Sequence, residues 1–393
     1  MIVNGKRALA YIVQIDSITP IEGADNIEMA HVGGWNVIIR KGEFDIGSRA
    51  VFFEIDSLLP EKEWSEFLRP KHFKVKTYKL GKFNAISQGL LLPTSILPDG
   101  TFAPVGTDVT DILGVTYYVK EDNKRKSNGV DKNAKYNNMA ARHKNLAKKK
   151  WFRWMMKREW GKKLLFVFLG RKKDKPKQFP SWIKKTDEDR IENMTWILEN
   201  KEPFVVTEKI DGTSTTFFID LTKFKTDFGV CSRNLRQMDM NQKNYHNDMN
   251  GLDGNVYWEM AIKYDIKNVL QKIADKCNAE RVVIQGETYG EKLQGNPLKI
   301  KGRDFAAFNL IIDGSRLGSL QAKEILDEYN VPFVPIIDEC YTMPDDFEEI
   351  KVSADGPSMI NDKCLREGFV YRSVDGKLST KNVSRNWLLK KKD

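Results

Sequence analysis

A short apolar run near the middle of the 393-residue chain ends in a lysine, and a carboxylate and a glycine follow closely. The segment reads Val205-Val206-Thr207-Glu208-Lys209-Ile210-Asp211-Gly212. A lysine attacks an electrophile only as the neutral amine, whereas its ordinary pKa of about 10.4 keeps it protonated at pH 7. Nearby cations or a bound metal favour the neutral form, Asp211 can hold a metal, and Gly212 lets the backbone approach a ligand. The pattern predicts a strand end that presents Lys209 for covalent chemistry, although an exposed turn at Asp-Gly has the same sequence.

Five segments downstream share one design, in which a short apolar strand has a polar residue at its end or beside a glycine. They are Cys231-Ser232-Arg233-Asn234, Val283-Ile284-Gln285-Gly286-Glu287, Phe305-Ala306-Ala307-Phe308-Asn309, Arg366-Glu367-Gly368-Phe369-Val370-Tyr371-Arg372 and Leu378-Ser379-Thr380-Lys381-Asn382. Such strands project side chains from a rigid sheet into a cleft. With the Lys209 segment, they resemble in content and order motifs I, Ia, III, IIIa, IV and V of the covalent nucleotidyltransferases, a superfamily of ligases and capping enzymes.

Two further segments and the end of the chain narrow the resemblance. Residues 206–214 and 184–191 are similar to those of ATP-dependent RNA ligases with an N-terminal OB domain. DNA ligases and capping guanylyltransferases carry an OB domain after motif V, and this chain ends 12 residues after Lys381. We therefore expect an RNA ligase, and keep as alternatives a DNA ligase, a capping-type guanylyltransferase and a non-catalytic nucleic-acid-binding protein.

The resemblance implies roles for the charged residues of the motifs. Lys209 would attack the α-phosphorus of ATP and form a lysyl-AMP intermediate. Asp211, Glu287 and Glu367 would surround a Mg²⁺ or Mn²⁺ ion through water molecules, because magnesium gives up its hydration shell reluctantly. Lys381 would steady the α-phosphate and discourage protonation of Lys209. The motif contains two lysines one residue apart in another branch, and here the earlier position is Ser379.

The resemblance also implies the nucleotide contacts and the reaction. Arg233 and Asn234 would face the ribose and the 5′-phosphate end, Phe308 would stack on the adenine, and Glu208 would read the adenine edge or the ribose. AMP would be loaded on Lys209, moved to the 5′-phosphate of an RNA, and expelled by a neighbouring 3′-hydroxyl. The implied enzyme is a monomer that acts in RNA repair on a nicked RNA duplex or paired ends, or on an RNA/DNA hybrid.

Charge is concentrated in one segment of the chain. Residues 120–178 contain 21 Lys and Arg against 5 Asp and Glu, so this segment carries +16 and the rest carries −6, for a net charge of +10. Residues 148–168 interleave cations with aromatic residues, which is typical of surfaces that neutralise phosphates and stack on bases. A basic amphipathic helix that docks on protein or on another surface has the same composition.

Hydrophobic patterning predicts two domains with a basic insert between them. Residues 1–119 alternate as short strands separated by glycine and proline turns, which favours an OB-like β-barrel. Residues 120–178 are the basic insert or linker, and residues 179–393 alternate strands with helices, as in an α+β nucleotidyltransferase domain. Thr186 followed by Asp189 predicts a capped helix that runs to about Glu199.

Cysteines, histidines and hydropathy exclude several classes of protein. The four cysteines lie far apart without a Cys-x-x-Cys pair, and the four histidines are scattered, so the sequence predicts neither a zinc site nor a disulfide framework. The chain contains no long apolar run and no signal peptide, so we expect an intracellular, cytoplasmic protein that does not bind membranes.

Overall fold

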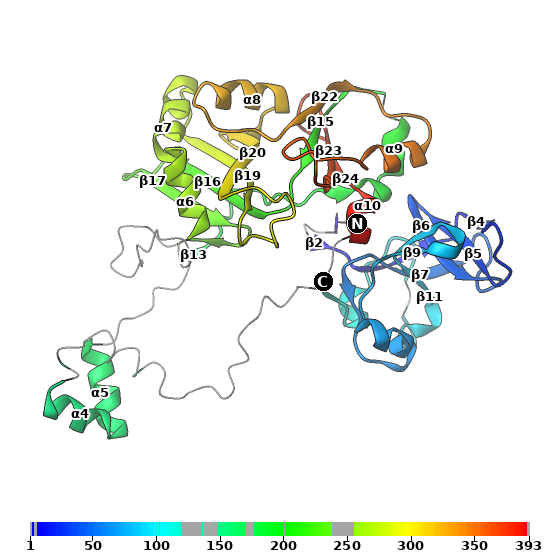
Figure 1. Cartoon of the computed structure of the whole chain (residues 1–393), viewed down its shortest axis with the longest axis horizontal. Helices are drawn as coiled ribbons and strands as arrows, with labels where there is room; N and C mark the ends of the chain where they lie inside the picture. Colours follow the sequence, from blue (N-terminus) through cyan, green and yellow to red (C-terminus); the bar gives the residue numbers. More distant parts are fainter. Residues whose placement is uncertain are drawn as a thin grey trace.

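The computed structural model describes residues 2–3, 6–101, 103–118, 136, 146, 148–169, 177–199, 201–237 and 255–390. Two regions are seen in Figure 1: an N-terminal β domain and a C-terminal domain of sheets and helices. Much of the predicted basic insert, and the first and last residues of the chain, lie outside the described residues.

The N-terminal domain is built from two three-stranded antiparallel sheets, in the orders β11-β7-β3 and β4-β5-β6, and from shorter strand pairs. The sheet strands are β3 (Ala10–Gln14), β4 (Ser17–Pro20), β5 (Ile27–Val32), β6 (Trp35–Arg40), β7 (Arg49–Phe53) and β11 (Leu90–Pro93). The pairs are β1 (Ile2–Val3) with β2 (Lys6–Arg7), β8 (Ser57–Leu58) with β12 (Thr116–Tyr117), and β9 (Thr77–Leu80) with β10 (Ala85–Gln88). The short helices are η1 (Glu63–Lys71), η2 (Gly81–Phe83), η3 (Thr94–Ile96) and α1 (Thr110–Leu113).

The sequence pattern explains why these strands form. Along β6, Trp35, Val37 and Ile39 are buried and alternate with more exposed residues, as expected for a strand with one face against a core. Strands β3 and β7 are apolar on both faces because two hydrophobic cores cover them. The predicted all-β domain is confirmed, although its described strands form separate sheets and not one continuous closed barrel.

The C-terminal domain contains two sheets. The seven-stranded sheet has the order β13-β18-β17-β16-β19-β20-β21, and the five-stranded sheet has the order β14-β24-β23-β15-β22. The strands of the first are β13 (Lys177–Gln178), β16 (Thr213–Asp220), β17 (Asp227–Ser232), β18 (Leu235–Arg236), β19 (Arg281–Gly290), β20 (Arg303–Ile312) and β21 (Ser315–Arg316). Those of the second are β14 (Asp189–Arg190), β15 (Phe204–Lys209), β22 (Ile336–Tyr341), β23 (Gly368–Ser373) and β24 (Ser379–Val383).

Helices cover the two sheets and bury their apolar faces (Figure 1). Helices α6 (Val256–Lys263), α7 (Ile266–Cys277) and α8 (Ser319–Asp327) pack on the seven-stranded sheet. Helix α9 (Phe347–Ser353) packs on the five-stranded sheet, and α10 (Arg385–Lys390) packs against β9 of the N-terminal domain. This architecture confirms the predicted α+β class.

The helix predicted from Thr186 to Glu199 is wrong. This segment contains β14 and the short 3₁₀ helices η4 (Ile191–Asn193) and η5 (Thr195–Glu199). Strand β14 pairs in parallel with β24, so that Arg190 lies opposite Lys381. The Thr186 hydroxyl lies 3.3 Å from that of Ser214 and does not cap a helix. Tertiary pairing therefore overrides the local capping signal in this segment.

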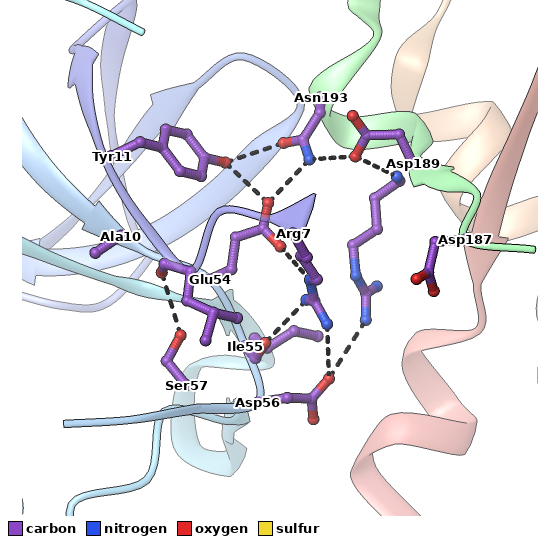
Figure 2. A network of polar contacts seen from close by, with 12 residues as sticks. Arg7, Ala10, Tyr11, Glu54, Ile55, Asp56, Ser57, Asp187, Asp189 and Asn193 are labelled. Carbon is purple, nitrogen blue, oxygen red and sulfur yellow. Dashed lines mark hydrogen bonds and ion pairs between the residues drawn. The ribbon is translucent and has the colours of Figure 1, made fainter. Parts of the chain in front are cut away.

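The turn after β14 joins the two domains through one asparagine (Figure 2). The Asn193 amide donates to Glu54 and Asp189, at 2.9 Å each. Its carbonyl oxygen accepts from the indole of Trp35 at 2.8 Å and lies 3.0 Å from the Tyr11 hydroxyl. Every hydrogen-bonding atom of the Asn193 side chain therefore has a partner, and three of the four partner residues belong to the N-terminal domain.

A partly buried ion pair lies beside this asparagine (Figure 2). Arg7 Nε donates to Glu54 at 2.8 Å, and Arg7 Nη2 donates to the Ile55 carbonyl at 3.0 Å. Burial disfavours the ionised Glu54 carboxylate, but the Arg7 guanidinium and further hydrogen-bond donors and charges, the Asn193 amide among them, outweigh it and lower the pKa of Glu54 to about 2. The pair fixes Arg7 at the boundary between the domains.

Helices α4 (Lys150–Met156) and α5 (Glu159–Leu169) lie within the basic insert and pack on each other through a small core around Phe152 and Leu165. The expected aromatic residues Trp151, Trp154 and Trp160 are about half exposed. Within the described residues, no helix is both long enough and apolar enough to cross a membrane.

We predict that Glu54→Gln destabilises the protein at neutral pH and that the difference from wild type shrinks in acid. The folded-state pKa of Glu54 is depressed, so its stabilisation is fully present above about pH 4.5 and is lost as the pH falls toward 2. The shift corresponds to a loss on the order of 3 kcal/mol. Urea unfolding at several pH values measures this difference, and Glu61→Gln, which changes an exposed carboxylate, is the matched control. A difference that stays constant down to pH 3 would contradict the prediction.

Candidate active site

The candidate residues lie where the chain passes from one sheet of the C-terminal domain to the other. Lys209 ends β15 of the five-stranded sheet, Asp211 and Gly212 form the connection, and β16 begins the path through the seven-stranded sheet. Glu287 lies on β19 of that second sheet. Glu367 directly precedes β23, which pairs with β15. The structure therefore brings together residues from both sheets around the Lys209 side chain.

Three carboxylates surround the amine of Lys209. Lys209 Nζ lies 2.7 Å from Glu367 Oε1, and Glu287 and Asp211 also act on its charge. Burial disfavours the protonated amine, but these three carboxylates outweigh it, and the pKa of Lys209 is raised. The sequence predicts nearby cations that favour the neutral amine. In this structure the immediate partners are carboxylates, so the charge state that they favour is the protonated one.

The same charges leave one carboxyl group reluctant to ionise. Burial, together with Glu367 and Asp211, raises the pKa of Glu287 to about 8, although Lys209 and the Gly212 amide oppose the rise. The Gly212 N–H donates to Glu287 Oε1 at 3.1 Å. Glu367 Oε2 is buried and has no hydrogen-bond partner among the described residues. The cluster thus carries excess negative charge and an unsatisfied oxygen, which a cation would compensate.

Glycine allows the strands to approach closely at two positions of the site. A Cβ atom on Gly368, which lies opposite Lys209, would fall 2.1 Å from the Asn382 carbonyl oxygen. A Cβ atom on Gly212 would fall 2.3 Å from the Thr288 carbonyl oxygen. Both contacts involve backbone, which cannot move aside cheaply. Gly368 therefore lets β23 and β24 approach closely within the five-stranded sheet, and Gly212 lets the connection after Lys209 approach β19 of the other sheet.

Lys381 lies among cations. Burial, followed by the charges of Arg7, Arg190 and Lys209, lowers the pKa of Lys381 to about 7, against an opposing effect of Asp187. Lys381 was expected to discourage protonation of Lys209. The repulsion between the two lysines instead lowers the pKa of Lys381, because Lys209 has carboxylate partners.

Arg190 adds a buried cation beside Lys381. Its side chain is almost fully buried, and its Nε and Nη1 atoms have no hydrogen-bond partner among the described residues. Its Nη2 atom lies 3.9 Å from Asp56 of the N-terminal domain. A buried guanidinium with unused donors is costly unless an acceptor satisfies it. The arrangement therefore fits a bound phosphate group near Lys381.

Phe308 is presented by an irregularity in β20. Gln285 pairs with Asn309, and the next residue, Gly286, pairs with Ala307, so Phe308 is the extra residue of a β-bulge. Bulges redirect a side chain relative to its strand and are frequent beside active sites. Arg372 Nη1 donates to the Phe308 carbonyl at 2.7 Å and connects β23 to this bulge. The Phe308 ring contacts the cluster around Ile210, which directly follows Lys209.

The other candidate residues, Glu208, Arg233 and Asn234, form their hydrogen bonds and ion pairs outside the carboxylate cluster. Glu208 is buried, and its carboxylate accepts from the Met359 N–H at 2.7 Å. Burial raises the pKa of Glu208, against the effect of that hydrogen bond. Arg233 forms an ion pair with Asp187, and Asn234 accepts from Lys185 at 3.0 Å. Arg233 and Asn234 thus lie at the outer side of the site, next to the segment before β14.

Sequence reasoning missed two residues of the N-terminal domain that reach this site. Arg7 acts on the charge of Lys381, and its guanidinium lies 5.7 Å from the centre of the Tyr117 ring. The Tyr117 pKa is raised by burial and Asp56, while Arg7, Arg233 and Arg190 oppose the rise. The sequence signal at Arg7 is weak, because one arginine in an N-terminal strand is common. No group of three or more Asp, Glu, His or Cys in the described ranges is arranged to ligate a metal directly.

Comparisons with known proteins agree with this architecture. Residues 9–94 match the description of an OB-fold domain, and residues 202–391 match that of RNA ligase. The Naegleria gruberi RNA ligase, solved as a mutant without ligand, is 30% identical with a TM-score of 0.73, covering 98% of each chain. The same ligase with PPi is 30% identical with a TM-score of 0.74, covering 98% of this chain and 99% of that one. A mutant of it with AMP and Mn is 29% identical with a TM-score of 0.74 and the same coverage. No curated protein gave a significant match.

A β domain followed by two sheets that meet at a lysine is the architecture of a covalent nucleotidyltransferase. The chain belongs to the RNA ligases with an N-terminal OB-fold domain. The predicted family and fold class are therefore confirmed.

We predict that Lys381 titrates near pH 7 and that Arg7→Gln or Arg190→Gln raises its pKa, because each removes a neighbouring positive charge. The folded-state pKa lies below the ordinary value of 10.5, so the unfolded chain binds more protons between about pH 7 and 10.5, and the contribution to stability increases with pH there. NMR of the lysine side-chain carbons across pH measures the midpoint, and Lys381→Met assigns the signal. Arg49→Gln should leave the midpoint unchanged. A wild-type midpoint above pH 9 would refute the assignment.

Proposed function

We propose that this RNA ligase uses ATP and a divalent metal, and joins RNA 3′-hydroxyl and 5′-phosphate ends through AMP carried on Lys209. The observation that supports it is the position of Lys209, whose amine lies 2.7 Å from Glu367 and whose charge acts on Lys381. Structures of the Naegleria gruberi RNA ligase include complexes with ATP and Mn and with AMP and Mn. The family and the site together favour the same nucleotide and ion for this chain.

Each candidate residue has a separate role in the proposed reaction. Lys209, once neutral, attacks the α-phosphorus, and pyrophosphate leaves as the nitrogen–phosphorus bond forms. Lys381 and Arg190 contact the phosphate oxygens and stabilise their charge. The Phe308 ring stacks on the adenine, and Glu208 contacts the adenine or the ribose. Arg233 and Asn234, at the outer side of the site, receive the 5′-phosphate end of the RNA. The adenylate then passes to that phosphate, and the 3′-hydroxyl displaces AMP.

The carboxylate cluster fits a hydrated divalent ion. Glu367 has a buried oxygen without a partner, and the raised pKa of Glu287 indicates uncompensated negative charge. Asp211, Glu287 and Glu367 would hold Mg²⁺ or Mn²⁺ through water, which agrees with the absence of a direct ligand set among the described residues. When bound, the ion would offset the carboxylates that favour protonated Lys209 and would stabilise charge on the α-phosphate.

We infer the type of RNA substrate from the joining reaction at this site. A nicked duplex, or two paired ends, holds the 3′-hydroxyl next to the adenylated 5′-phosphate, and an RNA/DNA hybrid provides the same geometry. We also propose that the enzyme acts as a monomer, because one chain contributes every candidate residue, and that it acts in RNA repair. The basic helices α4 and α5 are proposed as an additional RNA contact, because Trp151, Trp154 and Trp160 are half exposed and the Arg158 guanidinium lies 3.7 Å from the centre of the Trp154 ring.

We predict that incubation with α-labelled ATP and Mg²⁺ gives a protein-linked AMP that survives denaturing electrophoresis, and that Lys209→Ala abolishes it. The alanine variant lacks the only nucleophile proposed for this step. Lys377→Ala, which removes a highly exposed lysine, should label like wild type. Labelling with GTP instead of ATP would favour a capping guanylyltransferase, and wild-type labelling of the Lys209 variant would refute the nucleophile.

We predict that Glu287→Gln and Glu367→Gln each lower the rate of sealing by about 100-fold or more. Loss of one carboxylate that holds the metal costs a few kcal/mol, and each 1.36 kcal/mol is about tenfold in rate. The concentration of Mg²⁺ that gives half the maximal rate should rise in both variants. Glu324→Gln changes an exposed carboxylate on α8 and serves as the control. Normal sealing by the folded variants across a Mg²⁺ titration would show that these carboxylates do not support the metal.

A further inference from the structure

A buried arginine connects the two sheets of the C-terminal domain. Arg372 lies on β23 of the five-stranded sheet, and only 3% of the residue is exposed. Its Nη1 atom donates to the Phe308 carbonyl on β20 of the seven-stranded sheet at 2.7 Å, and to the Ser319 hydroxyl at the start of α8 at 3.3 Å. Burial disfavours a charged group that is not compensated, so this arginine needs a nearby anion.

Glu188 provides that negative charge. One of its carboxylate oxygens, Oε1, lies 3.4 Å from Arg372 Nη2 and 3.5 Å from Arg316 Nη1. Burial, together with the charge of Arg316, lowers the pKa of Arg372 to about 10, although Glu188 opposes the fall. Arg316 Nε in turn donates to the Gly376 carbonyl, in the connection between β23 and β24, at 2.8 Å. Removal of the Glu188 charge would therefore leave two neighbouring arginines without their shared anion.

Glu188 lies just before a cation of the candidate site. Arg190, two residues later, lies opposite Lys381 in the pairing of β14 with β24. Two residues of extended chain span at most about 7 Å, so a displacement of Glu188 is transmitted to Arg190. Glu188 therefore connects the segment that carries this cation, through Arg372, to the backbone of Phe308.

The Phe308 carbonyl belongs to the extra residue of the bulge in β20. Such a residue lies outside the regular ladder of its strand, so its orientation depends more on contacts from other elements. The hydrogen bond from Arg372 is a contact of this kind, and it comes from the sheet that also contains Lys209. The position of the Phe308 ring is thus tied to the five-stranded sheet as well as to its own.

We propose that Glu188 and Arg372 are positioning residues that set the distance between the Phe308 ring and the cations Arg190 and Lys381. The inference rests on the proposed function, which assigns the adenine to Phe308 and the phosphates to the two cations. Neither positioning residue contacts the nucleotide. A nucleotide is bound at both ends at once, so an error in this distance weakens binding of ATP more than binding of a ligand that has phosphates alone.

The test compares two ligands by isothermal titration calorimetry in the presence of Mg²⁺. The first is α,β-methylene ATP, in which a methylene group that Lys209 cannot displace replaces the bridging oxygen, and the second is tripolyphosphate, which lacks adenosine. Glu188→Gln should weaken binding of α,β-methylene ATP about 10-fold, the size of one lost charged hydrogen bond, and change binding of tripolyphosphate less than about 2-fold. Glu259→Gln should bind both ligands like wild type, because it breaks a similar pair with Arg303 at the start of the same strand β20.

A double variant shows whether Glu188 acts through Phe308. In the Phe308→Ala background, Glu188→Gln should have no further effect on α,β-methylene ATP, because the ring that it positions is absent. Arg372→Lys keeps the positive charge but loses the planar fork that reaches Phe308 and Glu188 together, so it should show the same selective loss. Thermal unfolding checks the fold of each variant, and if Arg372→Lys does not fold, Glu188→Gln and the double variant decide.

Self-adenylylation separates this inference from the proposed function. The ATP concentration that gives the half-maximal rate of adduct formation should rise about 10-fold in Glu188→Gln, while the rate at saturating ATP stays within about 2-fold of wild type. Failure of the wild-type protein to form the adduct would refute the proposed function, while the selective loss for α,β-methylene ATP would still support the positioning role. Three results would each overturn the inference: wild-type affinity of Glu188→Gln for α,β-methylene ATP, equal weakening of both ligands, or an undiminished effect of Glu188→Gln in the Phe308→Ala background.

Discussion

The ion pair between Arg7 and the buried Glu54 is the interaction on which the geometry of the site depends. A buried charge must be compensated, and here Arg7 donates to the Glu54 carboxylate, which also accepts from Asn193 of the other domain. The same asparagine donates to Asp189. The next residue, Arg190, lies opposite Lys381 in the pairing of β14 with β24. The contact between the domains thus also places two cations of the site. The N-terminal domain is therefore connected to the candidate site by direct hydrogen bonds and strand pairing.

The second constraint is the balance of charge around Lys209. The two lysines of the site are surrounded differently: carboxylates favour the protonated form of Lys209, whereas burial and then the nearby arginines favour the neutral form of Lys381. A nucleotide with its metal brings both signs of charge, since the metal complements the carboxylates and the phosphates complement the cations. The site is consequently matched to a metal–nucleotide complex as a whole, and less well to either component alone.

The sequence predicted the family, the two-domain architecture and the strand segments because each depends on local patterns. Alternating apolar residues indicate strands, and polar residues beside glycines mark their functional ends. Residues 186–199 were predicted as a helix because capping is also local, whereas their structure is decided by pairing with β24 and by Asn193. Arg7 and Tyr117 could not be predicted as neighbours of the site, since they come from segments about 110 residues apart that only the folded domain brings together.

The bulge at Phe308 has a consequence for how this strand can vary. Gln285 and Gly286 are adjacent in β19, whereas their partners in β20 are separated by Phe308. Deletion of one residue between Phe305 and Asn309 would restore a regular ladder and leave the rest of both strands paired. The sheet would remain paired along its length, but no side chain would project at the position that the Phe308 ring now occupies. The number of residues in this part of the chain is therefore constrained by the bulge. Under the role proposed for Phe308, a change of length would impair nucleotide binding in a protein that still folds.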